Sequence, residues 1–200
     1  MAKLKIVTYG HEALRTPAQP ITVWDANLRR FVQDMFDTMY RSNGVGLAAP
    51  QVSKPWQLFI LDCSTAGNKL PSMVCINPTI VAHSGACMSY EGCLSFPDVF
   101  TEVPRYSHIT LRYTDLLGKS QELTTNVEDQ PLLTRAIQHE MDHLSGTLFV
   151  DRIFEGDVEK INTLLAAKGL PPVETTKLLA EAEVHAMMEA SPQLRSMVIS

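Results

Sequence analysis

An apolar stripe through residues 26–40 predicts an amphipathic helix. Its members recur three or four positions apart and would line one helix face: Leu28, Phe31, Val32, Met35, Phe36 and Met39. Asp25 precedes the stripe, and an aspartate there can accept a hydrogen bond from the backbone of the first turn. We therefore expect a core helix that begins after Asp25 and ends near Arg41.

Shorter apolar runs predict strands in the middle of the chain. Residues 44–51 (GVGLAAPQ) carry glycines and a proline, which favour a shaped loop. Four strands are then expected, at 57–63, 72–78, 108–114 and 119–125, the last two joined as a hairpin by residues 115–118. Between Cys87 and Tyr106 the periodicity is lost, with Gly92, Pro97 and Pro104 interrupting it, so this region is expected to be loop or short edge strand.

Helical spacing returns after Gln130. Pro131 suits a first-turn position and Gly146 a helix end, while the residues between them place four side chains on one face: Leu132, Ala136, His139 and His143. Beyond Phe154, two further helical segments are expected at 157–169 and 173–190. We expect them to form a tail that packs loosely or is mobile. The class that these elements predict is α+β.

Composition narrows the classes of function. The 200 residues suffice for one domain, and 45% hydrophobic residues without a run of about 18 apolar positions predict a soluble protein that does not span a membrane. A net charge of -5 without a basic cluster argues against a nucleic-acid surface. The N-terminus shows no secretory signal, so we expect a cytoplasmic protein whose four cysteines are thiols.

The segment HEMDHLSGTLF, from His139 to Phe149, predicts a metal site on the second helix. Side chains four apart share a helix face, so His139 and His143 can bind one ion while Glu140 stands beside it. A catalytic Zn²⁺ or Fe²⁺ usually has three protein ligands and one open position. The alternative is a helix whose two histidines bind no metal.

The third ligand has candidates on both sides of this helix. Gly146 fits the pattern HExxHxxGxxH, but Phe149 stands where that pattern has its last histidine and cannot ligate a cation. Downstream, Glu155 and Glu159 offer carboxylates, but neither lies in a pattern that fixes it. Upstream, Cys93 in the sequence EGCLS could present a thiolate, which would complete a site suited to Zn²⁺ or Fe²⁺.

Three segments together resemble the signature motifs of the peptide deformylase family. They are GVGLAAPQ (44–51), EGCLS (91–95) and QHEMDHL (138–144), in the family's order and with similar separations. The likeness spans roughly residues 5 to 155. It implies an α+β fold with small mixed or antiparallel sheets around a central helix that bears HExxH. It also implies a catalytic domain at 1–154, followed by a C-terminal helical extension at 155–200.

The resemblance implies roles for particular residues. The metal ligands would be Cys93, His139 and His143, usually holding Fe²⁺, although Zn²⁺, Ni²⁺ or Co²⁺ can substitute. The reaction would remove the formyl group from the formyl-methionine of new polypeptides and release formate, with a metal-activated water and Glu140 as general base and acid. Gln51 and the Leu94 N–H would stabilise the oxyanion.

The same likeness places substrate contacts and partners. Gly46 would approach an extended substrate, and Val45, Leu132 and Ala136 would line the methionine pocket, although ordinary core positions are an alternative for each. The expected partners are nascent N-formyl-methionyl polypeptides. In some members a C-terminal helix docks to the ribosome, so a transient ribosome association is allowed, while the acidic tail predicts no specific contact with nucleic acid.

Several points remain open at this level. Many bacterial members carry an arginine shortly after the cysteine motif, where this chain has Phe100, which bears on peptide preference beyond methionine. Glu91 and Arg105 could form an ion pair that braces the cysteine segment, or a surface pair of little consequence. The competing functions are a zinc endopeptidase and a metal-holding or partner-binding protein without catalysis.

Overall fold

The structure, a computed structural model, describes residues 4–64 and 71–178. Its strands form a five-stranded antiparallel sheet in the order β1-β2-β3-β6-β7 and a separate two-stranded sheet of β4 and β5. The strands are β1 (Gly46–Ala48), β2 (Leu58–Leu61), β3 (Met73–Ser84), β4 (Cys87–Cys93), β5 (Phe96–Arg105), β6 (His108–Thr114) and β7 (Ser120–Asn126). The α-helices are α1 (Ala26–Arg41), α2 (Pro131–Ser145) and α3 (Val158–Ala167).

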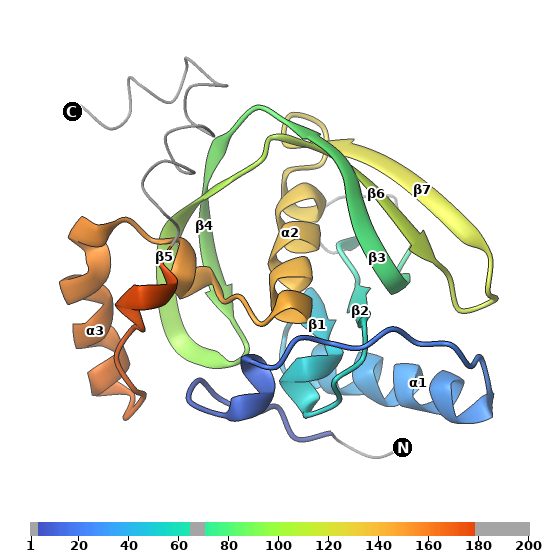
Figure 1. The fold of residues 1–200 in the computed structure, drawn as a ribbon, viewed down its shortest axis with the longest axis horizontal. Helices are drawn as coiled ribbons and strands as arrows, with labels where there is room; N and C mark the ends of the chain where they lie inside the picture. The colour runs from blue at the N-terminus through green and yellow to red at the C-terminus, as the bar shows by residue number, and fades with distance from the viewer. Residues whose placement is uncertain (1–3, 65–70, 179–200) are drawn as a thin grey trace.

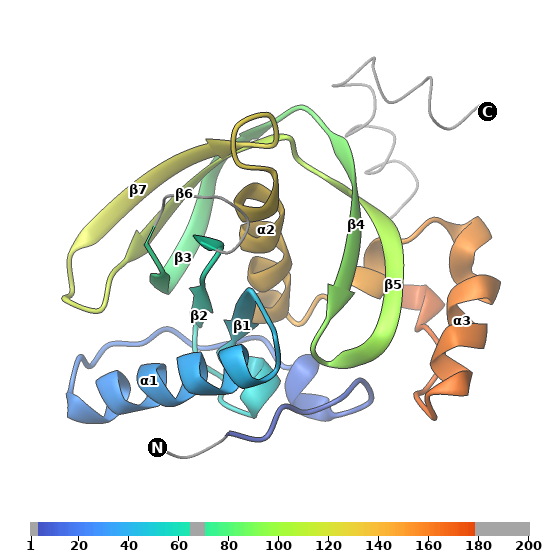
Figure 2. The same ribbon diagram turned by 180° about the vertical axis from the view of Figure 1, so that it is seen from behind.

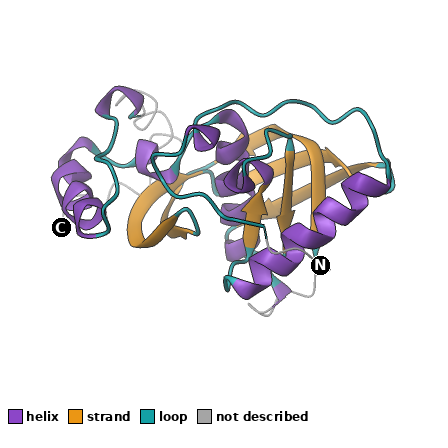
Figure 3. Cartoon of the chain, turned by 90° about the horizontal axis from the view of Figure 1, so that it is seen from below, coloured by secondary structure: helices purple, strands orange, loops and turns teal. Residues whose placement is uncertain are grey.

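Helix α2 lies in the centre of the fold. Figures 1 and 2 show it between the five-stranded sheet on one side and the β4–β5 hairpin on the other, with α3 on the outer side of β5. Figure 3 shows the same strands from below, with helical segments on either side of them. The predicted α+β class and the central position of the HExxH helix are therefore confirmed.

The first helix follows its sequence pattern closely. Asp25 caps α1, because its Oδ1 accepts a hydrogen bond of 2.8 Å from the backbone N–H of Leu28. Residues from the predicted apolar stripe are buried against β1 and β2 in one core cluster: Leu28, Val32, Met35 and Met39. The helix thus begins and ends where the sequence placed it.

One segment predicted as a loop and one predicted as a short strand contain more regular secondary structure than expected. Residues 44–51 contain β1 followed by a 3₁₀ helix at Ala49–Val52, where a shaped loop was expected. The predicted strand ended at Pro78, but strand β3 continues past this proline to Ser84. A register shift between Ile76 and Thr79 accommodates the proline, because a bulge removes the need for a ladder hydrogen bond from its nitrogen.

The expectation of loop or short edge strand between Cys87 and Tyr106 was wrong. Seven residues of β4 pair with the ten-residue strand β5 from Cys87↔Arg105 to Cys93↔Phe96. The alternation was obscured because several inward positions are polar, among them Ser89, Glu91 and Thr101. A two-stranded sheet also tolerates Pro97 and Pro104, since each strand has an edge that is not hydrogen-bonded to another strand.

The expected loosely packed tail is also wrong for its first part. Ile161 and Leu165 of α3 are completely buried in a core cluster that includes Tyr9, Phe96 and Phe149. Residues 173–178 contain only a short 3₁₀ turn at Thr175–Lys177. The rest of the predicted helix at 173–190 lies outside the described residues. Within the described ranges, no helix combines the length and the apolar character needed to cross a bilayer.

Gly146 ends α2 and allows the following chain to pass close to the N-terminal segment. Its φ of 76° is in the left-handed region, and a Cβ added there would lie 2.6 Å from the carbonyl oxygen of Arg15. Only glycine meets both requirements without strain.

We predict that Gly146→Ala lowers the free energy of unfolding by roughly 1–3 kcal/mol, because it adds backbone strain and a steric collision. Urea unfolding checks this. Gly118→Ala is the matched control, since Gly118 also has a positive φ of 79° but no atom within 4 Å of an added Cβ. Equal losses in the two variants would show that the contact with Arg15 contributes nothing.

Candidate metal centre and active site

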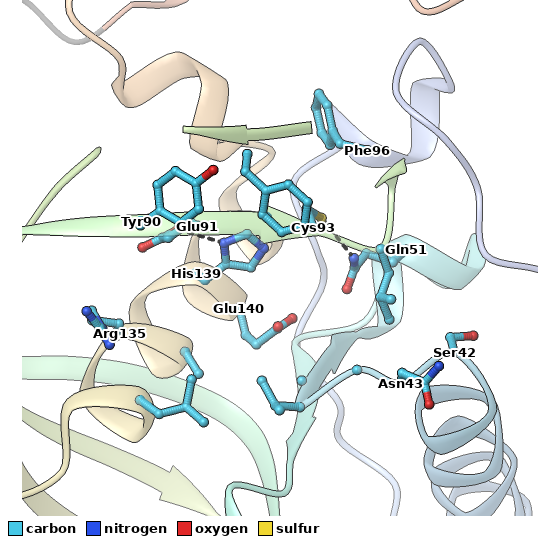
Figure 4. A pocket seen from close by; sticks show the side chains of 18 of the residues that line it. Ser42, Asn43, Gln51, Tyr90, Glu91, Cys93, Phe96, Arg135, His139 and Glu140 are labelled. Carbon is cyan, nitrogen blue, oxygen red and sulfur yellow. Dashed lines mark hydrogen bonds and ion pairs between the residues drawn. The ribbon is translucent and has the colours of Figure 1, made fainter. Parts of the chain in front are cut away.

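A cavity of about 520 Å³ opens between the β4–β5 hairpin, α2 and the segment before β1. The three segments that carried the sequence motifs all contribute to its lining. Figure 4 shows the side chains of His139, Glu140, Cys93 and Gln51 around it. The lining includes every predicted site residue except His143: Val45, Gly46, Gln51, Cys93, Leu94, Leu132, Ala136, His139 and Glu140.

Cys93, His139 and His143 form a cluster that can hold a metal ion. One ligand atom from each lies within 4.8 Å of the other two, and Cys93 Sγ is 3.3 Å from His143 Nε2. The two histidines come from successive turns of α2, while the cysteine comes from the end of β4. One thiolate and two imidazoles suit a Zn²⁺ or Fe²⁺ ion, so the residues fit the expected metal. Neither Glu155 nor Glu159 belongs to this group.

Glu91 orients the first histidine. Its Oε2 is 2.9 Å from His139 Nδ1, so Nε2 is the ring nitrogen that remains for a cation. The same carboxylate accepts two hydrogen bonds of 2.8 Å from Arg105, whose side chain is only 1% exposed. The ion pair that the sequence suggested therefore exists, and because it is buried, the alternative of a surface pair is wrong. A carboxylate that fixes a ligating histidine is a common support in metal sites.

Asp142 extends this network and was not anticipated from the sequence. It accepts a 2.6 Å hydrogen bond from Arg105 Nη1 and is also paired with Arg152. Burial favours the neutral form of its carboxyl, but the two guanidinium groups outweigh burial and lower the pKa of Asp142. The sequence did contain one signal for this role, since Asp142 lies between the two histidines of the predicted helix. A charged side chain within a buried helix needs a partner of opposite charge.

The cluster favours ionisation of its cysteine. Burial opposes a charged sulfur, but the imidazoles of His143 and His139 outweigh burial and lower the pKa of Cys93 to about 5. A thiolate is the form that binds a metal. The other cysteines differ, since burial raises the pKa of Cys63 to about 11 and that of Cys75 well above its usual value.

Glu140 is a buried carboxyl group that forms no ion pair with any of the described residues. It is 4% exposed, and its Oε2 has no hydrogen-bond partner among the described residues. Burial raises the pKa of Glu140 to about 7, although His139 and His143 act in the opposite direction. Its other oxygen lies over Gly46, where a Cβ would collide with the carboxylate. A carboxyl group tuned in this way beside a metal cluster can exchange protons near neutral pH.

Gln51 points its amide nitrogen at the metal cluster. Its Oε1 accepts a 2.8 Å hydrogen bond from the Ala48 N–H, which leaves Nε2 directed at Cys93 Sγ at 3.4 Å and Ser95 Oγ at 3.3 Å. Figure 4 marks the contact with Cys93. The residue is 2% exposed, so Gln51 is a buried residue of the site and not a surface amide. Leu94 follows the cysteine and also lines the cavity.

The remaining walls are largely apolar. Val45, Leu132 and Ala136 border the cavity on the side of β1 and α2. On the β4–β5 side, Phe100 is 47% exposed and stacks on Tyr90 with ring centroids 5.9 Å apart. The Phe100 ring covers Gly92, where a Cβ would collide with it. Phe100, at the position where the family resemblance implied an arginine in many members, is thus part of an exposed aromatic surface at the cavity.

A family model described as polypeptide deformylase matches residues 3–158. The peptide deformylase of Nitrosococcus oceani is 46% identical over 151 residues, which cover 76% of this chain and 87% of that protein. The peptide deformylase of Chlorobaculum parvum is 41% identical over 189 residues, covering 94% of this chain and 99% of that protein.

Solved structures show the same likeness in three dimensions. A peptide deformylase from Synechococcus elongatus, in complex with actinonin, has a TM-score of 0.78 and 37% identity, covering 88% of this chain and 91% of that one. A peptide deformylase from Legionella pneumophila has a TM-score of 0.76 and 37% identity, covering 84% and 96%.

We predict that Cys93→Ser weakens the binding of a divalent cation by at least about tenfold, because a serine hydroxyl is a harder and much less acidic ligand. Metal analysis after dialysis against a graded chelator measures the loss. Cys87→Ser serves as the control, since Cys87 is a half-buried thiol outside the cluster. Unchanged metal retention in Cys93→Ser would remove Cys93 from the site.

Proposed function

This chain belongs to the polypeptide deformylase family, metal-dependent hydrolases that remove the formyl group from the N-terminal formyl-methionine of nascent polypeptides, and we propose that it performs this reaction in the cavity beside Cys93. One observation carries the assignment of the site. A metal-binding cluster, a buried carboxyl group with a raised pKa and an amide donor share one cavity.

Glu140 acts as general base and then as general acid in this proposal. Cys93, His139 and His143 would hold a divalent cation, and that ion, when bound, would supply Lewis-acid activation of water. Glu140, in its ionised form, accepts the proton of the water that attacks the formyl carbon. It then gives a proton to the departing amine nitrogen, so that the C–N bond breaks and the products are formate and a free N-terminal methionine. A pKa near neutrality suits both transfers.

Gln51 and Leu94 stabilise the charge that develops on the formyl oxygen. The Gln51 amide is held by Ala48, so its Nε2 donor is already oriented before the reaction begins. The backbone N–H of Leu94 is the second donor, and it follows directly on Cys93. Donors that are already fixed in position stabilise an oxyanion more than mobile water does.

The substrate is held along β1 and beside α2. The free edge of β1 offers backbone hydrogen bonds at Gly46 to an extended peptide. Val45, Leu132 and Ala136 form an apolar wall that takes the methionine side chain. Arg135, which lies between Leu132 and Ala136 in the sequence, also lines the cavity and places a positive charge beside this apolar wall.

We propose Fe²⁺ as the physiological ion, one per chain, with Zn²⁺, Ni²⁺ or Co²⁺ able to substitute. The mixed sulfur and nitrogen donor set suits iron and zinc alike, and the family resemblance favours iron. We also propose a catalytic domain at 1–154 with a helical extension at 155–200, a cytoplasmic location, and a transient association with the ribosome without specific recognition of nucleic acid.

Formate release from a formyl-methionyl peptide tests the function. We expect release by protein purified without oxygen, in proportion to its metal content, and loss of activity in air if the ion is iron. The unformylated peptide is the control, because its cleavage would favour the endopeptidase alternative. Absence of release from fully metallated protein would overturn the proposed function.

Glu140→Gln should retain the metal but lose about 10²- to 10⁴-fold in kcat, because an amide of the same shape cannot accept the proton. Steady-state kinetics with metal analysis on the same sample checks this. Glu128→Gln is the control, since its exposed carboxylate lies outside the cavity. A Glu140→Gln variant with near-normal kcat at equal metal content would contradict the role.

A further inference from the structure

Ser89 places an unsatisfied hydroxyl group in the wall of the cavity. It lies on β4 opposite Val103 of β5, two residues before Glu91 and therefore on the same face of the strand. The residue is 1% exposed and borders the cavity. Its Oγ has no hydrogen-bond partner among the described residues.

The carboxylate on the same face of β4, that of Glu91, is engaged by other groups. Both carboxylate oxygens of Glu91 are engaged, by Arg105 and by His139. A buried hydroxyl without a partner is unfavourable, because it has lost its hydrogen bonds to water. Because Ser89 borders the cavity, an acceptor atom of a ligand bound there would supply the missing hydrogen bond.

We propose that Ser89 donates a hydrogen bond to the thioether sulfur of the substrate's methionine side chain. This rests on the proposed function, which puts that side chain between Val45, Leu132 and Ala136. The sulfur is the one heteroatom of the methionine side chain and a weak acceptor. Ser89 is thus a specificity-determining residue that distinguishes methionine from an apolar side chain of the same length.

Norleucine is the matched probe, because it replaces the sulfur by a methylene group and keeps the chain length. We expect the wild-type protein to prefer formyl-Met-Ala-Ser over formyl-norleucine-Ala-Ser by about three- to tenfold in kcat/KM, which corresponds to one weak hydrogen bond. Ser89→Ala should bring the ratio of the two kcat/KM values close to one, because kcat/KM for the methionine peptide falls.

The controls separate this effect from general damage. Ser107→Ala removes another buried serine hydroxyl, one that lies outside the cavity, and should leave the ratio unchanged. Metal content and thermal unfolding verify that each variant is folded. If Ser89→Ala does not fold, Ser89→Cys keeps the size and a weaker donor, and its ratio should fall between those of the wild type and one.

The outcomes distinguish the two proposals. Equal kcat/KM for the two peptides in the wild type, or an unchanged preference in Ser89→Ala, overturns the role of Ser89 and leaves deformylation intact. Absence of formate from both peptides with metallated wild-type protein overturns the proposed function itself. The unfolding temperature is a second readout. The product Met-Ala-Ser should raise it more than norleucine-Ala-Ser does in the wild type. In Ser89→Ala, the two peptides should raise it equally.

Discussion

The buried guanidinium of Arg105 holds together the elements that build the site. It bonds to Glu91 on β4 and to Asp142 on α2, while Arg105 itself ends β5. Two consecutive strands and a helix more distant in sequence are therefore fixed to one planar group with several donors. Since Glu91 also contacts His139, the carboxylate that pairs with Arg105 also sets the orientation of a candidate metal ligand.

This arrangement explains why so many charges are tolerated in the interior. Buried ions are costly unless each has a partner, and loss of one member leaves the others uncompensated. Glu91 and Asp142 carry the negative charges, and Arg105 and Arg152 carry the positive ones. Glu140 stands outside this balance, which is why burial raises its pKa while those of Glu91 and Asp142 are lowered.

The sequence predicted best where short-range periodicity decides the structure. The apolar stripe of α1, its Asp25 cap and the Gly146 end of α2 were all visible in the pattern and are confirmed. The β4–β5 hairpin was missed, because its inward positions carry Ser89 and Glu91 to serve the site, and polar inward residues conceal strand alternation. The metal cluster was found through motifs, whereas the partners of Asp142 depend on contacts that no local pattern encodes.

The packing of α3 joins the first part of the described chain to its last part. Val7 and Tyr9 share a core cluster with Ile161, Leu165 and Val173, and the Tyr9 hydroxyl donates to the carbonyl of Pro172. Phe96, three residues after the cysteine ligand, stacks on Tyr9 in that cluster. During synthesis on the ribosome, this core cannot close until residue 173 has been added. The support behind Cys93 is therefore completed only when nearly all of the described chain has been made.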